Sequence, residues 1–300
     1  MSIAWRDQPE GGSTAALKII VWIAQHLGRT VTHLSLVPVA SYFFIFRREE
    51  RLASRQFLTR VYEGPVSSWL VYRHFLTFSR VAADRIFFLT DYSDKISVNV
   101  HGVQQLRKLV EKKKGGIILA SHMGSFEAAR VLGEEIDDVV IRVILNRGVS
   151  EKFIQQLEAL SSNLADAIID SEQGAAALGL KIAESLQSGE WVGFLADRYQ
   201  SGDRTLSCEF LGDQARFPVG PFIIAAVFKV PVICIFPLYV RGKYEVYCEI
   251  ISDEFVLPRE NRDQGLRDSV QQYVDRLSRY ARQEPCNWFN FYDFWKDGCE

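Results

Sequence analysis

Several signals that would assign a protein to a common class are missing from this 300-residue sequence. No two of its five cysteines form a CxxC pair and their number is odd, which favours reduced thiols in a cytosolic compartment over a disulfide framework. The first ten residues are polar, so no cleavable signal peptide is expected. The formal net charge of −2 argues against a nucleic-acid binder that depends on a global positive field.

Common catalytic and metal-binding motifs are also absent. The chain has no GxSxG nucleophile motif and no glycine-rich phosphate loop. Its five histidines include no pair at the spacing that metal ligands on one helix require, and three of them lie in the N-terminal quarter. We therefore expect no metal and no cofactor, and few histidines compete for a catalytic role.

The N-terminal region contains two apolar stretches, residues 17–27 and 31–46, separated by Gly28 and Arg29. Neither reaches the roughly 20 uninterrupted apolar residues that a membrane span needs. A basic flank follows them, made of Arg47, Arg48, Arg51, Arg55 and Arg60. This pattern predicts an interfacial or re-entrant helical hairpin on an anionic leaflet, formed by residues 1–48, and a main domain over 49–300. The alternative is a buried helical pair that packs on the main domain.

The rest of the chain alternates between strand and helix patterns, after a helix over residues 50–88 that Pro65 interrupts. Strands are predicted at 96–101, 117–120, 139–145, 167–169, 191–195, 232–238 and 244–251. Helices are predicted at 104–114, 126–135, 150–160, 174–188, 222–229 and 262–282. This order predicts an α/β fold with a mostly parallel or mixed central sheet flanked by helices. The wholly apolar run 117–120 is typical of a strand covered on both faces.

Polar residues follow that apolar strand and could form an active site at its carboxyl end. On one continuous helix His122 and Glu127 would point about 140° apart, so they can meet only if His122 lies in a turn before the helix. Gly124 supplies freedom for that turn, and Ser125 can cap the helix. The pair would then be an imidazole oriented by a carboxylate, which suits a general base. The alternative is a surface histidine near a helix start, and the spacing alone leaves both open.

Two further strand ends carry polar residues. Asn146 and Arg147 follow the strand at 139–145, and Asp197 and Arg198 follow the strand at 191–195. Arginines at a sheet edge suit a phosphate, because a guanidinium binds it through two parallel hydrogen bonds. Solvated arginines paired with a neighbouring aspartate are the equal alternative.

The run GGIILASHMGSFE at residues 115–127 resembles the first motif of the bacterial lipid A biosynthesis (late) acyltransferases, within the lysophospholipid acyltransferase superfamily. That motif is a histidine, four residues, and then an acidic residue. Further matches in order are found at 98–102, 191–198, 210–212, 217–221 and 230–237. The resemblance covers roughly residues 95–295, and the N-terminal apolar segment stands where the family has its membrane anchor. Phe217 and Pro218 fall in the family's substrate-binding loop.

The sequence also departs from the lipid A enzymes. Phe126 stands where those enzymes usually have tryptophan, and Arg198 stands where glutamine commonly follows the aspartate. The segments at 5–13 and 288–295 look similar to a branch of stand-alone acyltransferases found with aryl polyene pigment pathways. The resemblance therefore leaves the acceptor open between lipid A and another lipid.

The resemblance implies transfer of a fatty or polyene acyl group from an acyl thioester to a hydroxyl or amine of a lipid acceptor. The donor would be an acyl carrier protein or a coenzyme A thioester, and the place would be the cytoplasmic face of a bacterial inner membrane. His122 would act as the base, Glu127 would hold its tautomer, and the amides around Gly124 and Ser125 would stabilise the oxyanion. The expected substrate-binding residues are Gly124, Ser125, Asn146, Arg147, Asp197, Arg198, Phe217 and Pro218.

Two other functions stay open on the sequence. One is a non-catalytic lipid-binding or scaffold protein that uses the apolar N-terminus and the aromatic C-terminal tail as contact surfaces. The other is a hydrolase of acyl thioesters, which would release the acyl group without an acceptor.

Overall fold

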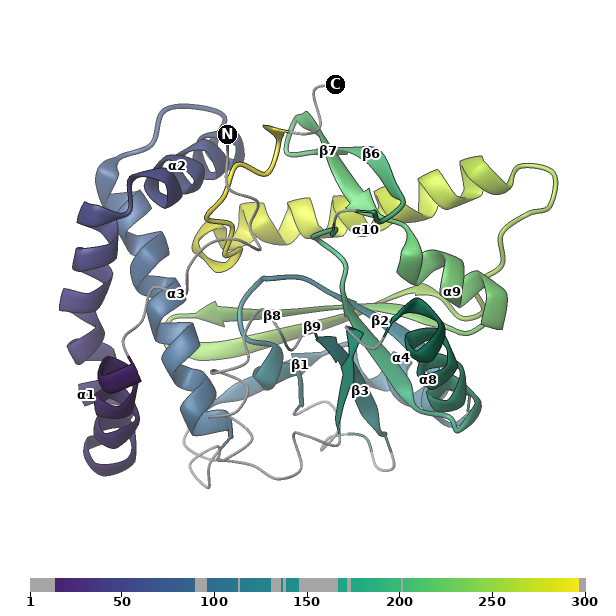
Figure 1. The fold of residues 1–300 in the computed structure, drawn as a ribbon, viewed down its shortest axis with the longest axis horizontal. Helices are drawn as coiled ribbons and strands as arrows, with labels where there is room; N and C mark the ends of the chain where they lie inside the picture. The colour runs from purple at the N-terminus through teal and green to yellow at the C-terminus, as the bar shows by residue number, and fades with distance from the viewer. Residues whose placement is uncertain are drawn as a thin grey trace.

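A computed structural model describes residues 14–89, 96–112, 114–130, 136, 139–145, 167–171, 174–200 and 202–296. Three helices come first: α1 (Thr14–Phe46), α2 (Arg48–Tyr62) and α3 (Ser68–Phe88). Pro65 lies between α2 and α3, at the interruption that the sequence predicts. Figure 1 shows these three helices grouped at one end of the molecule, beside a central sheet.

The central sheet has seven strands in the described part of the chain, in the order β1-β9-β8-β2-β5-β3-β4. They are β1 (Val98–His101), β2 (Gly116–Ala120), β3 (Ile141–Leu145), β4 (Ile168–Asp170), β5 (Trp191–Leu195), β8 (Val232–Val240) and β9 (Lys243–Ser252). Only β8 and β9 pair antiparallel, and every other neighbouring pair is parallel. The predicted mostly parallel α/β sheet is confirmed, and β2 is buried along its whole length as predicted.

Helices cover both faces of this sheet. They are α4 (Val103–Val110), α8 (Ala175–Gln187), α9 (Gly220–Phe228) and α10 (Arg262–Gln283), with short 3-10 helices η3 (Phe126–Arg130) and η6 (Pro285–Asn287). Successive residues of β2 point to opposite faces, so Ile117 and Leu119 join the core under α9 and α10 while Ile118 joins the core with α4. The predicted helix at 150–160 lies outside the described residues.

The segment predicted as a substrate-binding loop is instead a β-hairpin. Strands β6 (Thr205–Phe210) and β7 (Asp213–Pro218) pair antiparallel and form a separate sheet that packs on α10 (Figure 1). Buried side chains alternate with exposed ones along both strands, for example Phe210 and Phe217 on the inner face. The predicted loop is wrong because a period of two favours strands.

Helix α1 bends sharply at Gly28, whose φ of 78° and ψ of 176° are not helical. The hydroxyl of Thr32 donates to the Gly28 carbonyl at 2.9 Å and so satisfies an acceptor that the bend releases. One face of α1 packs along α3, with Leu36 and Ala40 buried. Apolar side chains also point away from the protein, and the most exposed include Ile19, Trp22, Leu34, Ile45 and Phe46. Among the described helices, none combines the length and apolar character needed to cross a membrane.

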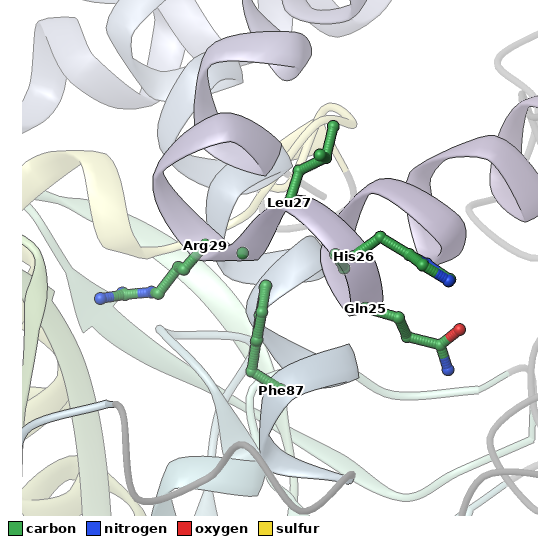
Figure 2. A pocket seen from close by; sticks show the side chains of 7 residues that line it. Gln25, His26, Leu27, Arg29 and Phe87 are labelled. Carbon is green, nitrogen blue, oxygen red and sulfur yellow. The ribbon is translucent and has the colours of Figure 1, made fainter.

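A hollow of about 350 Å³ lies at this bend and is lined by residues 24–29 and Phe87. Figure 2 shows the side chains that line it. The rings of His26 and Trp22 stack at 4.8 Å beside it. None of the residues predicted to bind substrate lines this hollow, so it is separate from the predicted active site.

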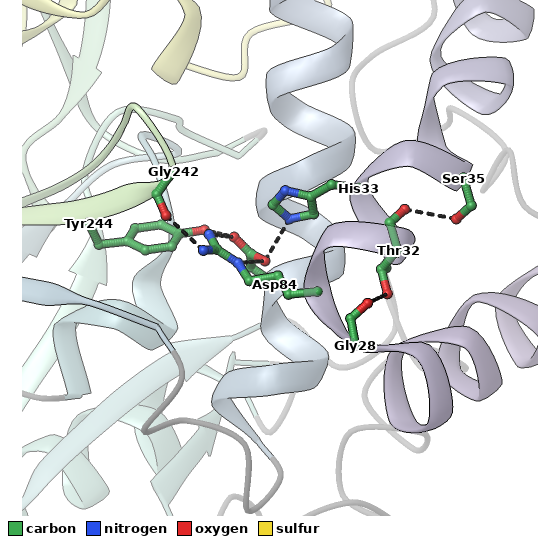
Figure 3. Close-up of polar contacts among 8 residues, drawn as sticks. Gly28, Thr32, His33, Ser35, Asp84, Gly242 and Tyr244 are labelled. Carbon is green, nitrogen blue, oxygen red and sulfur yellow. Dashed lines mark hydrogen bonds and ion pairs between the residues drawn. The ribbon is translucent and has the colours of Figure 1, made fainter.

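A buried ionic cluster ties α1 to the rest of the protein (Figure 3). The carboxylate of Asp84 on α3 has no exposed surface and accepts from Arg29 Nε (2.8 Å), Arg29 Nη2 (2.7 Å) and Tyr244 Oη (2.9 Å). His33 Nε2 lies 2.8 Å from the same carboxylate, and Arg29 Nη1 donates to the Gly242 carbonyl at 2.7 Å. Burial raises the pKa of Asp84, but Arg29 and His33 outweigh burial and hold it below its ordinary value. We call Arg29, His33, Asp84 and Tyr244 the Asp84 clasp.

Candidate active site

The site forms where two neighbouring parallel strands end. Ala120 at the end of β2 is the partner of Leu195 at the end of β5. His122 and Asp197 each come two residues further on, so the register of the sheet brings them side by side. His122 Nδ1 lies 2.9 Å from Asp197 Oδ1, and the backbone N–H of His122 donates to Asp197 Oδ2 at 3.0 Å.

The chain turns sharply after His122, as the sequence predicts. Gly124 has a φ of 61°, and a Cβ atom built on it would lie 1.5 Å from the carbonyl oxygen of Pro237 on β8. Glycine is therefore required here both for the backbone conformation and for close contact with β8. The described part of the predicted helix over 126–135 is the 3-10 helix η3, and residues 131–135 lie outside the described residues.

The carboxylate that contacts His122 is not the one the sequence predicts. Within the described residues no hydrogen bond joins Glu127 to His122. Glu127 instead accepts from the Ser125 hydroxyl at 2.9 Å, and both of its oxygens lie 3.1 Å from Arg85 Nε. The predicted His122–Glu127 contact was wrong because five residues separate the two along one turn, whereas Asp197 arrives from a neighbouring strand.

Asp197 is buried, and its predicted contact with substrate stays a prediction. Its side chain has no exposed surface, and Trp288 Nε1 donates to its Oδ2 at 2.9 Å. The carboxylate therefore receives the imidazole, one backbone N–H and one indole N–H. Burial raises the pKa of Asp197, but the contacts with His122 outweigh it and, with the charge of Arg198, hold that pKa far below its usual range. Asp197 is a fixed anion behind His122.

His122 is neutral and accessible at neutral pH. Burial, together with the charges of Arg198 and Arg85, lowers its pKa below the ordinary 6.5 and outweighs the opposing effect of Asp197. A carboxylate can only accept, so the Nδ1 that faces Asp197 carries the hydrogen. The side chain is 29% exposed, and Nε2 has no hydrogen-bond partner in the described part of the structure. This arrangement leaves Nε2 able to take a proton from a bound molecule.

The charges of two guanidinium groups act on this imidazole. The Arg85 group is held by Glu127, and the Arg198 group lies 5.2 Å from the centre of the Tyr292 ring and donates to the Phe289 carbonyl at 2.8 Å. The phosphate-binding role of Arg198 stays a prediction. Asn146 and Arg147, predicted to bind beside it, lie outside the described residues.

The predicted oxyanion hole is not present at the amides proposed for it. The backbone N–H of Gly124 donates to the Asn287 carbonyl at 2.9 Å, and that of Ser125 donates to the Pro237 carbonyl at 3.2 Å. The Ser125 hydroxyl donates to Glu127 and does not cap η3. Both amides are already engaged, because the turn around Gly124 is built against β8 and the C-terminal tail. In the described ranges no group of three or more His, Cys, Asp or Glu side chains is placed to hold a metal ion.

Phe217 and Pro218 lie behind the site and not on its surface. Both are buried on β7, and the Phe217 ring contacts the rings of Tyr273 and Phe294. Their contact with substrate stays a prediction.

Sequence reasoning missed Arg85 and Trp288. Arg85 is on α3, far from the motif in sequence, and no spacing rule connects it to Glu127. Trp288 opens the aromatic tail, which the sequence linked to a branch of the family and to a candidate contact surface but not to the active site. The sequence did contain a signal for the pairing of His122 with Asp197. Each of the two residues follows the end of an apolar strand by two positions, which places both at the same edge of a parallel sheet.

Two comparisons with known proteins bear on the family of this chain. No curated protein matches the chain. A family model described as bacterial lipid A biosynthesis acyltransferase matches residues 75–297, which include β2, β5, the described site residues and the aromatic tail. The match covers well over half of the 300 residues, and the chain therefore belongs to the bacterial lipid A biosynthesis acyltransferase family.

Proposed function

We propose that the protein transfers an acyl group from an acyl thioester to a hydroxyl or amine of a lipid acceptor, with His122 as the general base. The observation that carries this proposal is the pairing of His122 Nδ1 with the buried Asp197, which leaves Nε2 open on the exposed side. The same arrangement activates the nucleophile in serine hydrolases. Here the nucleophile would be the acceptor itself, so no covalent acyl-enzyme is required.

The steps balance without any other reactant. Nε2 of His122 takes the proton from the acceptor as the acceptor oxygen or nitrogen bonds to the thioester carbonyl carbon. The tetrahedral intermediate then breaks its carbon–sulfur bond, and the imidazolium returns the proton to the leaving thiolate. Asp197 stabilises the imidazolium between these two steps, because its carboxylate is already oriented toward Nδ1.

Glu127 acts through Arg85 in this proposal. Its carboxylate holds the guanidinium near His122, and Arg198 places a second positive charge there. Positive charge beside the base suits the oxyanion of the tetrahedral intermediate and the phosphate of a donor carried on phosphopantetheine or coenzyme A. After burial, which has the larger effect, this positive charge also lowers the pKa of His122.

The test is an acyl transfer assay of the His122→Ala protein with acyl carrier protein thioesters and with acyl coenzyme A. We expect transfer to fall by about 10³-fold or more, by analogy with loss of the base from a catalytic triad. His101→Ala is the matched control, since His101 is 49% exposed, pairs with Glu245 and lies outside the site. Near-wild-type transfer by the His122 variant would overturn the proposal. Acyl release without an acceptor in the wild-type protein would favour the hydrolase.

For the acceptor we propose an envelope lipid, either of lipid A type or of the aryl polyene type that the tail and the N-terminal segment suggest. The mass spectrum of the lipid extract of a deletion strain, compared with the parent, would identify it. The missing species should be heavier than its precursor by one acyl group. An unchanged lipid profile would contradict an envelope-lipid acceptor.

We also propose that the protein acts at the cytoplasmic face of the inner membrane, through its N-terminal helices. An apolar groove of about 410 Å³ lies between α1 and α3, and it is lined by Ser41, Phe44, Ile45, Ser68, Trp69 and Tyr72. At its edge Ile45, Phe46 and Trp69 are each at least 60% exposed. The arginines that open α2 lie directly after it, so apolar and basic groups meet as they do in interfacial helices.

This membrane proposal is tested with a triple variant of the full chain, Ile45→Ser, Phe46→Ser and Trp69→Ser. Binding to phosphatidylglycerol vesicles in a sedimentation assay should fall by at least about tenfold. A matched triple replaces three equally exposed apolar residues elsewhere, Leu180, Val227 and Val256, by serine. Equal loss in both triples, or no loss in the first, would contradict the proposal.

A further inference from the structure

The C-terminal tail pairs directly with the turn that carries His122. The N–H of Gly124 donates to the Asn287 carbonyl at 2.9 Å, and the N–H of Phe289 donates to the His122 carbonyl at 2.8 Å. Met123 and Trp288 face each other between these two bonds as an antiparallel bridge. The tail therefore holds the backbone on both sides of Met123, directly after the proposed base.

The side chain of Trp288 reaches the proposed partner of that base. Its indole Nε1 donates to Asp197 Oδ2 at 2.9 Å, and the same oxygen accepts the backbone N–H of His122. The indole is buried completely, with the rings of Phe57, Phe210 and Phe294 at 4.9–5.1 Å. A ring enclosed in this way cannot turn its N–H elsewhere, so it directs one donor at one carboxylate oxygen.

The backbone of Trp288 is fixed from the opposite side. His74 Nε2 donates to the Trp288 carbonyl at 2.9 Å, and the Ser54 hydroxyl lies 2.8 Å from His74 Nδ1. Burial lowers the pKa of His74 to about 4, so the ring is neutral and its tautomer is set by the carbonyl acceptor. A continuous hydrogen-bonded path thus runs from α2 through α3 and the tail to Asp197.

We propose that Trp288 is a positioning residue of the His122–Asp197 pair, which it serves by fixing the Asp197 carboxylate through its indole N–H. This inference rests on the proposed role of His122 as base. With the indole donor removed, Oδ2 keeps only the backbone N–H of His122, and the carboxylate gains freedom to rotate. It also becomes a stronger acceptor toward Nδ1, which favours the protonated imidazole.

The test compares Trp288→Phe with Trp295→Phe in the full chain. Trp295 is a matched control because it is buried in the same aromatic cluster, while its Nε1 points at the Phe210 carbonyl at 3.4 Å and not at Asp197. For Trp288→Phe we expect kcat about tenfold lower with KM little changed, and an acid limb of the pH–rate profile displaced to higher pH. Trp295→Phe should leave both unchanged.

A second measurement does not depend on activity. The pKa of His122, followed by NMR of histidine-labelled protein, should rise in Trp288→Phe and stay the same in Trp295→Phe. If Trp288→Phe fails to fold, a benzothienylalanine at position 288 keeps the ring shape and removes only the N–H. An unchanged His122 pKa in a folded variant that lacks this N–H would overturn the inference. Full activity of His122→Ala would instead overturn the proposed function, and the NMR result would still report on Trp288.

Discussion

Two buried aspartates in this protein have opposite surroundings. Asp84 and Asp197 both have no exposed surface, and each contacts one histidine at 2.8–2.9 Å. Asp84 is paired with Arg29, whose guanidinium contacts both carboxylate oxygens. Within the described residues, the groups that hydrogen-bond to the Asp197 carboxylate are an imidazole, a backbone N–H and an indole N–H, and none of them carries a fixed charge.

This difference separates a structural carboxylate from one suited to catalysis. The charge of Asp84 is neutralised permanently by Arg29, so the clasp contributes to holding α1 in place. The contact partner of Asp197 becomes positive only when His122 takes a proton, which is the event that base catalysis requires. The His122 side chain is 29% exposed, so a bound acceptor can reach it, whereas the His33 side chain in the clasp is only 14% exposed.

The largest effects should come from neutralising the two aspartates separately. Asp197→Asn should reduce kcat by about 10³–10⁴-fold and leave the protein folded, because the His122 tautomer would no longer be set correctly.

Asp84→Asn should keep the activity of the folded protein but lower the free energy of unfolding by about 3–5 kcal/mol, because it leaves the partly buried Arg29 charge without its partner. Transfer assays and urea unfolding of both variants measure these effects.

Glu127→Gln sharpens the same comparison. Since Glu127 contacts Arg85 and not the imidazole, its loss should cost less activity than Asp197→Asn. A larger loss of activity in Glu127→Gln than in Asp197→Asn would instead support the pairing of His122 with Glu127 that the sequence alone predicts. An equal loss of stability in the Asp84 and Asp197 variants, without a difference in activity, would remove the distinction between the two sites.

A smaller effect is expected from pH. The proposed base must be unprotonated, and its pKa is lowered below 6.5, so kcat/KM should be level near neutral pH and fall about tenfold per unit below that pKa. The pKa of Asp84 lies below 3.8, so the clasp stays ionised while activity is lost. Between pH 6.5 and about 4 the unfolded chain binds a proton at His74 that the folded protein excludes, and stability should fall as the pH falls through this range.

Initial rates and thermal melts measured on the same samples separate these contributions. Rates should be taken well below the melting temperature at each pH, so that unfolding does not mimic the titration of His122. An acid limb centred above pH 6.5 would contradict the environment described for His122.

The sequence predicted much of the fold because strand and helix periods are local properties. The strand at 191–195 and the long helix near 262–282 match the structure closely. The hairpin β6–β7 was missed, since its alternating residues lie within a segment that was interpreted as a loop. The Asp84 clasp was not foreseen either, because it joins residues from α1, α3 and β9 that no local pattern connects.

The sequence by itself determined the α/β class, the family and the position of His122 in a glycine turn after a buried strand. These follow from hydrophobic period, from the steric freedom of Gly124 and from motif order. Only the tertiary structure decided which carboxylate His122 contacts. Strand order placed β5 beside β2, and that contact lies between residues 75 positions apart. The tertiary structure also decided that the indole N–H of Trp288 donates to Asp197. No local pattern in the sequence connects these two residues, because they are 91 positions apart.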